Sequence, residues 1–175
     1  MNEPDIPKIN DEIARKFRKI KADLTSRQSA VALFEALLAE IETQFGIPFV
    51  WLSLIRLPET AGLLKSLEAS ALLCERLNSI EQARFLEIIP DAASTLLVNG
   101  DLRPFFRLLP RNRKYFIRSL AVSPITLHGR LIGSMNHGDA SPTRYKPGMD
   151  TTLLMQLARS VSDRLTRLLP PSFLT

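Results

Sequence analysis

The chain has 175 residues, of which 45% are hydrophobic, and a net charge of +5 at pH 7. This length suits one domain, or one domain with an appendage, and the apolar content excludes a wholly disordered chain. No apolar run approaches the ~20 residues that span a bilayer, and the acidic, proline-containing start is unlike a secretory signal. The single cysteine, Cys74, excludes an internal disulfide framework and is expected to be a small buried hydrophobe. We expect a cytoplasmic protein, whose mildly basic charge favours anionic partners.

The first helix is predicted by apolar residues that recur every three or four positions after a loose tail at residues 1–7. These residues are Ile9, Ile13, Phe17, Ile20 and Leu24. A helix cannot bury such a stripe alone. The stripe can pack on a second copy of the chain, on the chain's own domain, or on an anionic surface such as a membrane or nucleic acid. In the first case these five residues would form a homodimer interface.

The second helix is predicted to lie over about 25–45. Thr25 and Gln28 have the Thr-x-x-Gln spacing of a capping box, and a core-facing apolar stripe runs on to Phe45. Gly46, with a proline soon after it, is typical of a helix C-terminus.

A buried strand is predicted at 49–57, where the run FVWLSLIRL is rich in strand-forming residues. Side chains alternate between the two faces of a strand, so Trp51 and Ser53 share one face and Leu52 and Leu54 share the other. If the leucine face takes the helices, Trp51 and Ser53 face the opposite side of the sheet.

The middle of the chain shows weaker patterns. Helical spacing runs through 60–77, and Ser79 with Gln82 offers a second capping box, for a short helix to about Ile89. A short strand is predicted at about 95–98, followed by a single helical turn that Asp101 would cap.

The last third of the chain predicts a hairpin and a long helix. Strand-like runs at 117–127 and 130–138 flank His128-Gly129, a plausible tight turn, and Pro124 predicts a bulge or an edge position nearby. Asp150 is a good N-cap for the final helix. That helix carries its apolar side chains on one face: Leu154, Leu157, Ala158, Val161, Leu165 and Leu168.

The hairpin sequence VSPITLHGRLIGSMNHG, residues 122–138, resembles that of a GAF domain. The following passage, RYKPGMDTTLLMQLARSVSDRL at 144–165, resembles the bacterial GAF-like domain-of-unknown-function family 484, in which an Arg-aromatic-x-Pro-Gly-Met run precedes a leucine-rich helix. The resemblance implies an α+β (two-layer α/β) fold, with an antiparallel sheet and with the first and last helices packed on one face. It places a GAF-like domain at 25–175, after an N-terminal helical extension at 1–24.

The functional subsets of this family carry signatures that the chain matches poorly. The cyclic-nucleotide subset has an Asn-Lys…Phe…Asp-Glu signature, of which Asn112, Arg113 and Phe116 are a fragment without the acidic pair. The bilin-binding subset uses a suitably placed cysteine, whereas Cys74 lies in a helical stretch before the hairpin. The methionine-sulfoxide reductase subset works through several cysteines.

Residues 102–138 contain no acidic residue. They hold seven cations: Arg103, Arg107, Arg111, Arg113, Lys114, Arg118 and Arg130. Guanidinium groups bind phosphate or carboxylate in forked geometry, so the stretch is either an anion site, for a nucleotide, a phosphorylated metabolite or nucleic acid, or a solvated basic face.

The two histidines and the single cysteine offer no spaced set of metal ligands, and no nucleophile motif surrounds the serines near His137. We therefore expect neither a cofactor nor catalysis. The residues selected as candidates for ligand binding are Trp51, Ser53, Arg111, Arg113, Arg118, Met135 and His137.

The sequence predicts a non-catalytic regulatory or sensory domain, expected to be a homodimer that responds to a small ligand or a protein partner. Two alternatives remain open. One is a binding protein for a small anionic ligand, a nucleotide or a phosphometabolite. The other, less favoured, is a nucleic-acid-associated accessory protein that uses the basic stretch 103–118.

Overall fold

A computed structural model describes residues 5–90, 94–109 and 116–170, with side chains from residue 11 onward. Within these ranges the chain forms an α+β fold of five α-helices and one five-stranded sheet. The helices are α1 (Asp5–Leu24), α2 (Ala30–Phe45), α3 (Ala61–Glu68), α4 (Gln82–Ile88) and α5 (Thr152–Leu168). The strands are β1 (Phe49–Arg56), β2 (Leu77–Glu81), β3 (Leu96–Asn99), β4 (Ser119–Leu127) and β5 (Arg130–Asp139). No helix in the described ranges is both long enough and apolar enough to cross a membrane.

The sheet is mixed, in the order β2-β1-β5-β4-β3. Three neighbouring pairs are antiparallel, as expected, but β1 and β2 run parallel, joined by α3. Of the helical stretch predicted at 60–77, only α3 is an α-helix, and β2 begins at Leu77, the last residue of that stretch. Ser79 lies inside β2 instead of capping a helix. The error has a physical reason, because a five-residue edge strand with one buried side chain, Ile80, gives little period-two signal.

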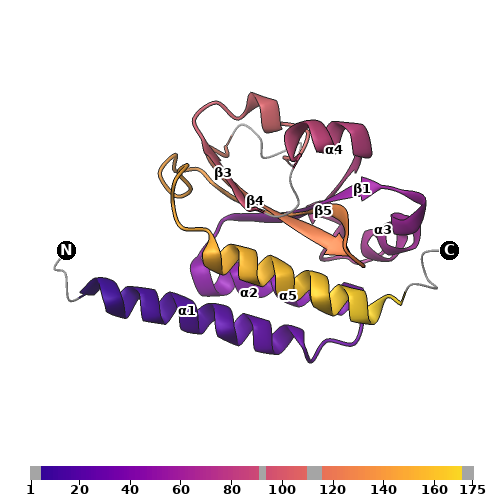
Figure 1. The fold of residues 1–175 in the computed structure, drawn as a ribbon, viewed down its shortest axis with the longest axis horizontal. Helices are drawn as coiled ribbons and strands as arrows, with labels where there is room; N and C mark the ends of the chain where they lie inside the picture. The colour runs from indigo at the N-terminus through magenta and orange to yellow at the C-terminus, as the bar shows by residue number, and fades with distance from the viewer. Residues whose placement is uncertain (1–4, 91–93, 110–115, 171–175) are drawn as a thin grey trace.

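Helices α2 and α5 pack side by side on one face of the sheet, as the resemblance implied, and α1 lies along them as an outer layer (Figure 1). Helix α4 lies on the opposite face (Figure 1). We call the face under α2 and α5 the helix face, and the face toward α4 the far face.

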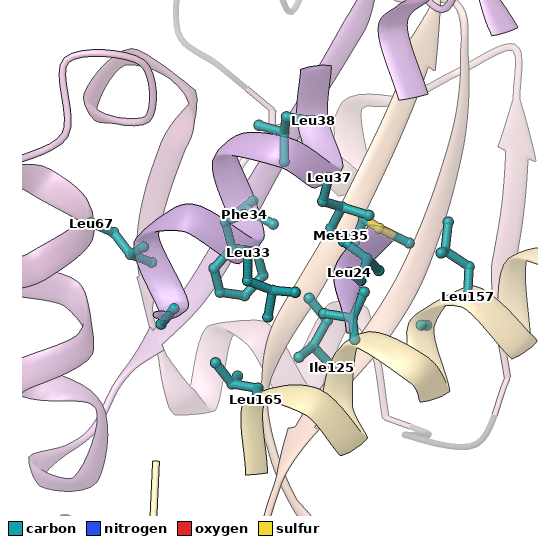
Figure 2. Close-up of a cluster of buried hydrophobic side chains, with 14 of the residues drawn as sticks. Leu24, Leu33, Phe34, Leu37, Leu38, Leu67, Ile125, Met135, Leu157 and Leu165 are labelled. Carbon is teal, nitrogen blue, oxygen red and sulfur yellow. The ribbon is translucent and has the colours of Figure 1, made fainter. Parts of the chain in front are cut away.

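The core on the helix face is built mainly from leucines of α2 and α5 that close around Met135 of β5 (Figure 2). The stripe on α1 joins this core, since Phe17, Ile20 and Leu24 are buried at 8%, 0% and 1% exposure, and Ile13 packs against it. The chain's own domain is therefore the partner of this stripe. Three of the five residues predicted as a homodimer interface are already buried within the chain, and the side chain of a fourth, Ile9, lies outside the described residues.

Ser29, and not the predicted Thr25 box, caps α2. The Ser29 hydroxyl accepts a hydrogen bond from the Ala32 amide at 3.1 Å, whereas the Thr25 hydroxyl donates to the Ala22 carbonyl at 2.7 Å at the end of α1. The predicted end of the helix is confirmed, because Gly46 follows Phe45 with a left-handed φ of 61°.

Cys74 was expected to be buried in a helix, and this was wrong. Helix α3 ends at Glu68, and Cys74 begins a separate 3-10 turn, where it is exposed. Periodicity could not reveal the break, because apolar residues continue through it and the chain must turn there to bring β2 beside β1.

The predicted hairpin is confirmed. His128 and Gly129 both have positive φ, 51° and 79°, in a two-residue turn between β4 and β5. Pro124 lies beyond the last residue of β4 that pairs with β3, Val122, and the register with β5 shifts after Ile125. Proline has no amide hydrogen to donate, and the nitrogen of Pro124 faces an unpaired edge of β4. No hydrogen bond between strands is therefore lost at this position.

Candidate functional site

The register between β1 and β5 sorts the candidate ligand residues onto two faces of the sheet. Trp51 pairs with Asn136 and Ser53 with Ser134, on the far face. Met135 and His137, the other two candidates on these strands, alternate with them and lie on the helix face. The candidates therefore do not form one site, and Met135 is fully buried in the core of Figure 2.

The far face carries a buried polar network that joins the two strands. The Asn136 amide donates to the Ser53 hydroxyl at 2.9 Å, and the Ser134 hydroxyl donates to the Asn136 amide oxygen at 2.8 Å. All three residues are fully buried. Sequence reasoning selected Ser53 but missed Ser134 and Asn136. The signal was polar residues at alternate positions of an otherwise apolar strand, which mark one face of a buried sheet.

The carbonyl of Leu108 closes this network. It accepts hydrogen bonds from the Trp51 indole nitrogen at 2.5 Å and from the Ser53 hydroxyl at 3.2 Å. Leu108 and Leu109 follow the 3-10 turn at Arg103–Phe105 and pack with Trp51 in a second core. Trp51 therefore fills the core on the far face and ties the covering segment, residues 102–109, to the sheet.

The basic stretch is partly neutralised. Asp101 pairs with Arg103 at 2.8 Å, and hydrogen bonds from Arg103 lower the pKa of Asp101 to about 2. Glu59 pairs with Arg130 at 2.5 Å. Arg118, like Arg107, is exposed. Two candidate residues, Arg111 and Arg113, lie outside the described residues together with Lys114.

The helix face holds a cavity of about 370 Å³. Helices α1, α2 and α5, the loop at 140–151 and strands β3 and β5 contribute side chains to its lining. Ten of its lining residues are apolar: Ile13, Phe17, Ile41, Phe45, Ile47, Leu97, Met149, Leu153, Leu154 and Leu157. The four other lining residues are His137, Arg144, Tyr145 and Asp150.

His137 is the most buried polar group of this cavity. It is 1% exposed, and neither of its ring nitrogens has a hydrogen-bond partner among the described residues. Burial, assisted by the nearby Arg144 charge, lowers the pKa of His137 to about 4, so the imidazole is neutral at pH 7. The Tyr145 ring lies 6.4 Å from it, centroid to centroid. Burial raises the pKa of Tyr145 to about 12, so the phenol is neutral as well.

The loop over the cavity is held by Arg144. Its Nη2 donates to the Phe45 carbonyl at the end of α2 at 2.9 Å, and its Nη1 lies 3.6 Å from an Asp139 carboxylate oxygen. At the end of the loop, the Asp150 carboxylate accepts from the Thr152 amide at 2.9 Å and from its hydroxyl at 2.6 Å. These bonds lower the pKa of Asp150. Asp150 was predicted to be the N-cap of α5, but the cap position is Thr151. The Asp150 carboxylate instead binds Thr152, the first residue of the helix, from one position further back.

A family model for the GAF domain matches residues 29–165. This chain belongs to the GAF domain family. Among solved structures, the free methionine-R-sulfoxide reductase from Neisseria meningitidis, in complex with its substrate, is similar at 19% identity, with a TM-score of 0.58 over 86% of this chain and 87% of that chain. At that identity the likeness shows a shared fold. A search of curated proteins found no match.

Within this GAF domain, the two faces of the sheet are two separate candidate sites. The far face offers the network of Ser53, Asn136 and Ser134 under the covering segment, and the helix face offers the cavity with His137. No group of three or more His, Cys, Asp or Glu side chains in the described part of the GAF domain is placed to hold a metal ion.

Proposed function

We propose that this GAF domain is a non-catalytic regulatory module that binds a small ligand on the far face of its sheet. The observation that carries the proposal is the double hydrogen bond to the Leu108 carbonyl from Trp51 and Ser53. One backbone oxygen holds the covering segment to two buried donors. A ligand that presents its own acceptor to these donors would replace the carbonyl and release the segment, which is a shift between two conformations.

The charges near the covering segment favour an anionic ligand. Two arginines have exposed side chains, Arg107 and Arg118. Arg107 is next to Leu108 in the chain. Forked guanidinium groups suit phosphate and carboxylate. We therefore place nucleotides and phosphorylated metabolites first among candidate ligands. Nucleic acid is an alternative ligand. Binding that weakens steeply with added salt would indicate it.

A reductase activity is not part of this proposal. The similar structure from Neisseria meningitidis is a methionine-R-sulfoxide reductase, and the family resemblance seen in the sequence associates that subset with several cysteines. This chain has Cys74 alone, in an exposed 3-10 turn after α3. A single thiol at that place does not supply a second cysteine for a disulfide step.

We also propose that the protein is a homodimer, in keeping with its resemblance to GAF domains. Its contacts would lie outside Phe17, Ile20 and Leu24, because these side chains are buried within the chain. Native mass spectrometry of protein purified gently from its host tests the dimer and any retained ligand together. A monomer would contradict this second proposal and leave the first unaffected.

The ligand proposal is tested by thermal shift with ATP, cyclic AMP and phosphorylated sugars. A ligand that binds only the native state at about a hundred times its Kd stabilises it by about 2.7 kcal/mol. We expect such a rise in Tm for at least one compound, and a smaller one in Ser53→Ala. The matched control is Ser160→Ala, a half-buried serine of α5 on the other side of the sheet, whose hydroxyl donates to the Gln156 carbonyl. Equal shifts in both variants would contradict the far-face site, as would the absence of any shift together with no retained mass.

A further inference from the structure

We propose that the cavity on the helix face is a second binding site, for a small uncharged molecule with an apolar body and one polar group that hydrogen-bonds to His137. The proposal does not depend on the far-face site, because strands β1 and β5 separate the two. It stands on three features of the described residues: the size and lining of the cavity, the partnerless imidazole, and the balance of charge around the opening.

The cavity suits a small ligand. Its volume of about 370 Å³ lies near the lower end of the roughly 300–1,000 Å³ common for small-molecule pockets. Side chains from α1, α2 and α5 supply an apolar wall, for example Ile13, Phe45 and Leu154. The ligand's body is therefore aliphatic or aromatic, since burying apolar surface here is favourable at roughly 25 cal/mol per Å².

The polar group of the ligand has one specific partner. Buried polar atoms in proteins are nearly always hydrogen-bonded, and a buried group left without a partner is destabilising. His137 lines the cavity with both ring nitrogens unpartnered among the described residues, while the buried serines and asparagine of the far face are paired. Both nitrogens are covered by neighbouring atoms, so a small shift of the side chains beside the imidazole must accompany binding. A neutral imidazole has one donor and one acceptor nitrogen, so a hydroxyl or a carbonyl of the ligand can then pair with it.

The charges around the opening point to an uncharged ligand. Arg144 and Asp139 approach each other at 3.6 Å, and Asp150 lines the cavity near Arg144. The Lys16 amine lies 5.8 Å from the centroid of the Phe45 ring, another wall residue. The positive charges of Lys16 and Arg144 are thus balanced by the negative charges of Asp139 and Asp150. An ion would gain no net attraction here and would lose its hydration on entering an apolar cavity.

A bound molecule would touch three helices at once. Ile13 and Phe17 come from α1, Phe45 from the end of α2, and Leu157 from α5. Helix α1 packs on α2 and α5 at the outside of the domain (Figure 1). Filling the cavity would therefore hold α1 against the domain more firmly, and this would be the structural response to the ligand.

The test is a titration of the full chain with 1-octanol, which has an apolar body and one hydroxyl, followed by ¹H–¹⁵N NMR. Octanoate is the charged comparison. Leu154→Trp fills the cavity, and Leu168→Trp, on the same helix but outside the cavity lining, is the matched control. His137→Leu removes the polar partner, and His137→Gln restores a donor and an acceptor.

We expect saturable octanol binding that is retained in Leu168→Trp and lost in Leu154→Trp. A net hydrogen bond of the usual strength corresponds to about tenfold in affinity, so His137→Leu should bind about tenfold more weakly and His137→Gln should recover part of the loss. Absence of saturable binding in the unaltered chain would overturn the site. Equal affinity in His137→Leu would overturn the role of the imidazole, and tighter binding of octanoate would overturn the uncharged class.

Discussion

The far face and the helix face of the sheet are built from alternate residues of the same strands, yet the buried polar residues that β5 presents to the two faces differ in their hydrogen bonding. On the far face, Asn136 is hydrogen-bonded to both Ser134 and Ser53, and apolar side chains fill the surrounding space. On the helix face, His137 is just as buried, but it borders a cavity and has no partner among the described residues.

This difference separates two uses of buried polarity. A satisfied network adds to stability and fixes the position of the segment that covers it. An unsatisfied group beside a cavity lowers stability, and the ligand proposed for the helix face would supply its missing partner. The far face must therefore move to admit a ligand, whereas the helix face already has room for one.

The largest contrast between the faces is expected from removing apolar bulk. Trp51→Ala empties a fully buried site on the far face and leaves the Leu108 carbonyl with Ser53 alone, which should lower the free energy of unfolding by about 3–5 kcal/mol. Leu154→Ala only enlarges an existing cavity at a partly buried position, so we expect about 1 kcal/mol. Urea unfolding of both variants measures the difference, and equal losses would contradict a filled far face.

The two glycines of β5 test how tightly each side is packed. A Cβ on Gly133 would lie 2.1 Å from the Ser53 carbonyl oxygen, a backbone atom that can move only with strand β1. A Cβ on Gly138 would meet side-chain atoms of Ile117 and Trp51 at 3.1 and 3.2 Å. We expect Gly133→Ala to destabilise by about 3 kcal/mol and Gly138→Ala by about 1 kcal/mol. The reverse order in chemical denaturation would show that β1 and β5 are less closely apposed than described.

His137 should make the helix face sensitive to acid. Its folded-state pKa of about 4 is below its ordinary value of 6.5, so the unfolded chain takes up a proton first as the pH falls. The stability present above pH 6.5 is therefore lost progressively between about pH 6.5 and pH 4, by about 3 kcal/mol in all.

Denaturant unfolding of His137→Leu over the same pH range is the control for this effect. The variant lacks the titrating group and the partnerless nitrogens, so it should be more stable than the natural chain, with the gap widening as the pH is lowered. Carboxylates titrate in both proteins and drop out of the difference. A constant gap between the two proteins would show that the pKa of His137 is the same in the folded and the unfolded chain.

The smallest effect is expected at the cap of α2, the helix that covers the helix face. Ser29→Ala removes the acceptor for the Ala32 amide and should cost about 1 kcal/mol. Thr25→Ala, at the position that the sequence favoured, removes only an exposed bond to the Ala22 carbonyl and should change stability by less than about 0.5 kcal/mol. A larger loss from Thr25→Ala in thermal melts would indicate that α2 begins earlier.

Patterns local to the sequence predicted much of the fold. The alternation in 49–57 placed Trp51 and Ser53 on one face and the leucines on the other, and the stripe from Leu154 to Leu168 placed α5 against the sheet. The tight turn at His128-Gly129 and the irregularity near Pro124 followed from backbone chemistry alone. Each of these depends on residues that are close in sequence, which is why the sequence was sufficient.

The sites depended on contacts that no local pattern contains. The pairing of β1 with β5 separated Met135 and His137 from Trp51, although all four strand candidates had been grouped together. The return of residues 102–109 over the far face brought the Leu108 carbonyl to Trp51, 57 positions away. Arg144 reaches the Phe45 carbonyl across 99 positions, and this bond holds the loop that encloses His137.

The sequence by itself determined which side chains share a face of each helix and strand, because the periods of 3.6 and 2 are properties of the backbone. Only the tertiary structure decided what each face meets. The apolar stripe of α1 packs on its own domain, Cys74 is exposed to solvent, and His137 lines a cavity. The physical reason is that burial and hydrogen bonding are completed by residues distant in the chain, so a polar group's partner, or its lack of one, appears only when the layers come together.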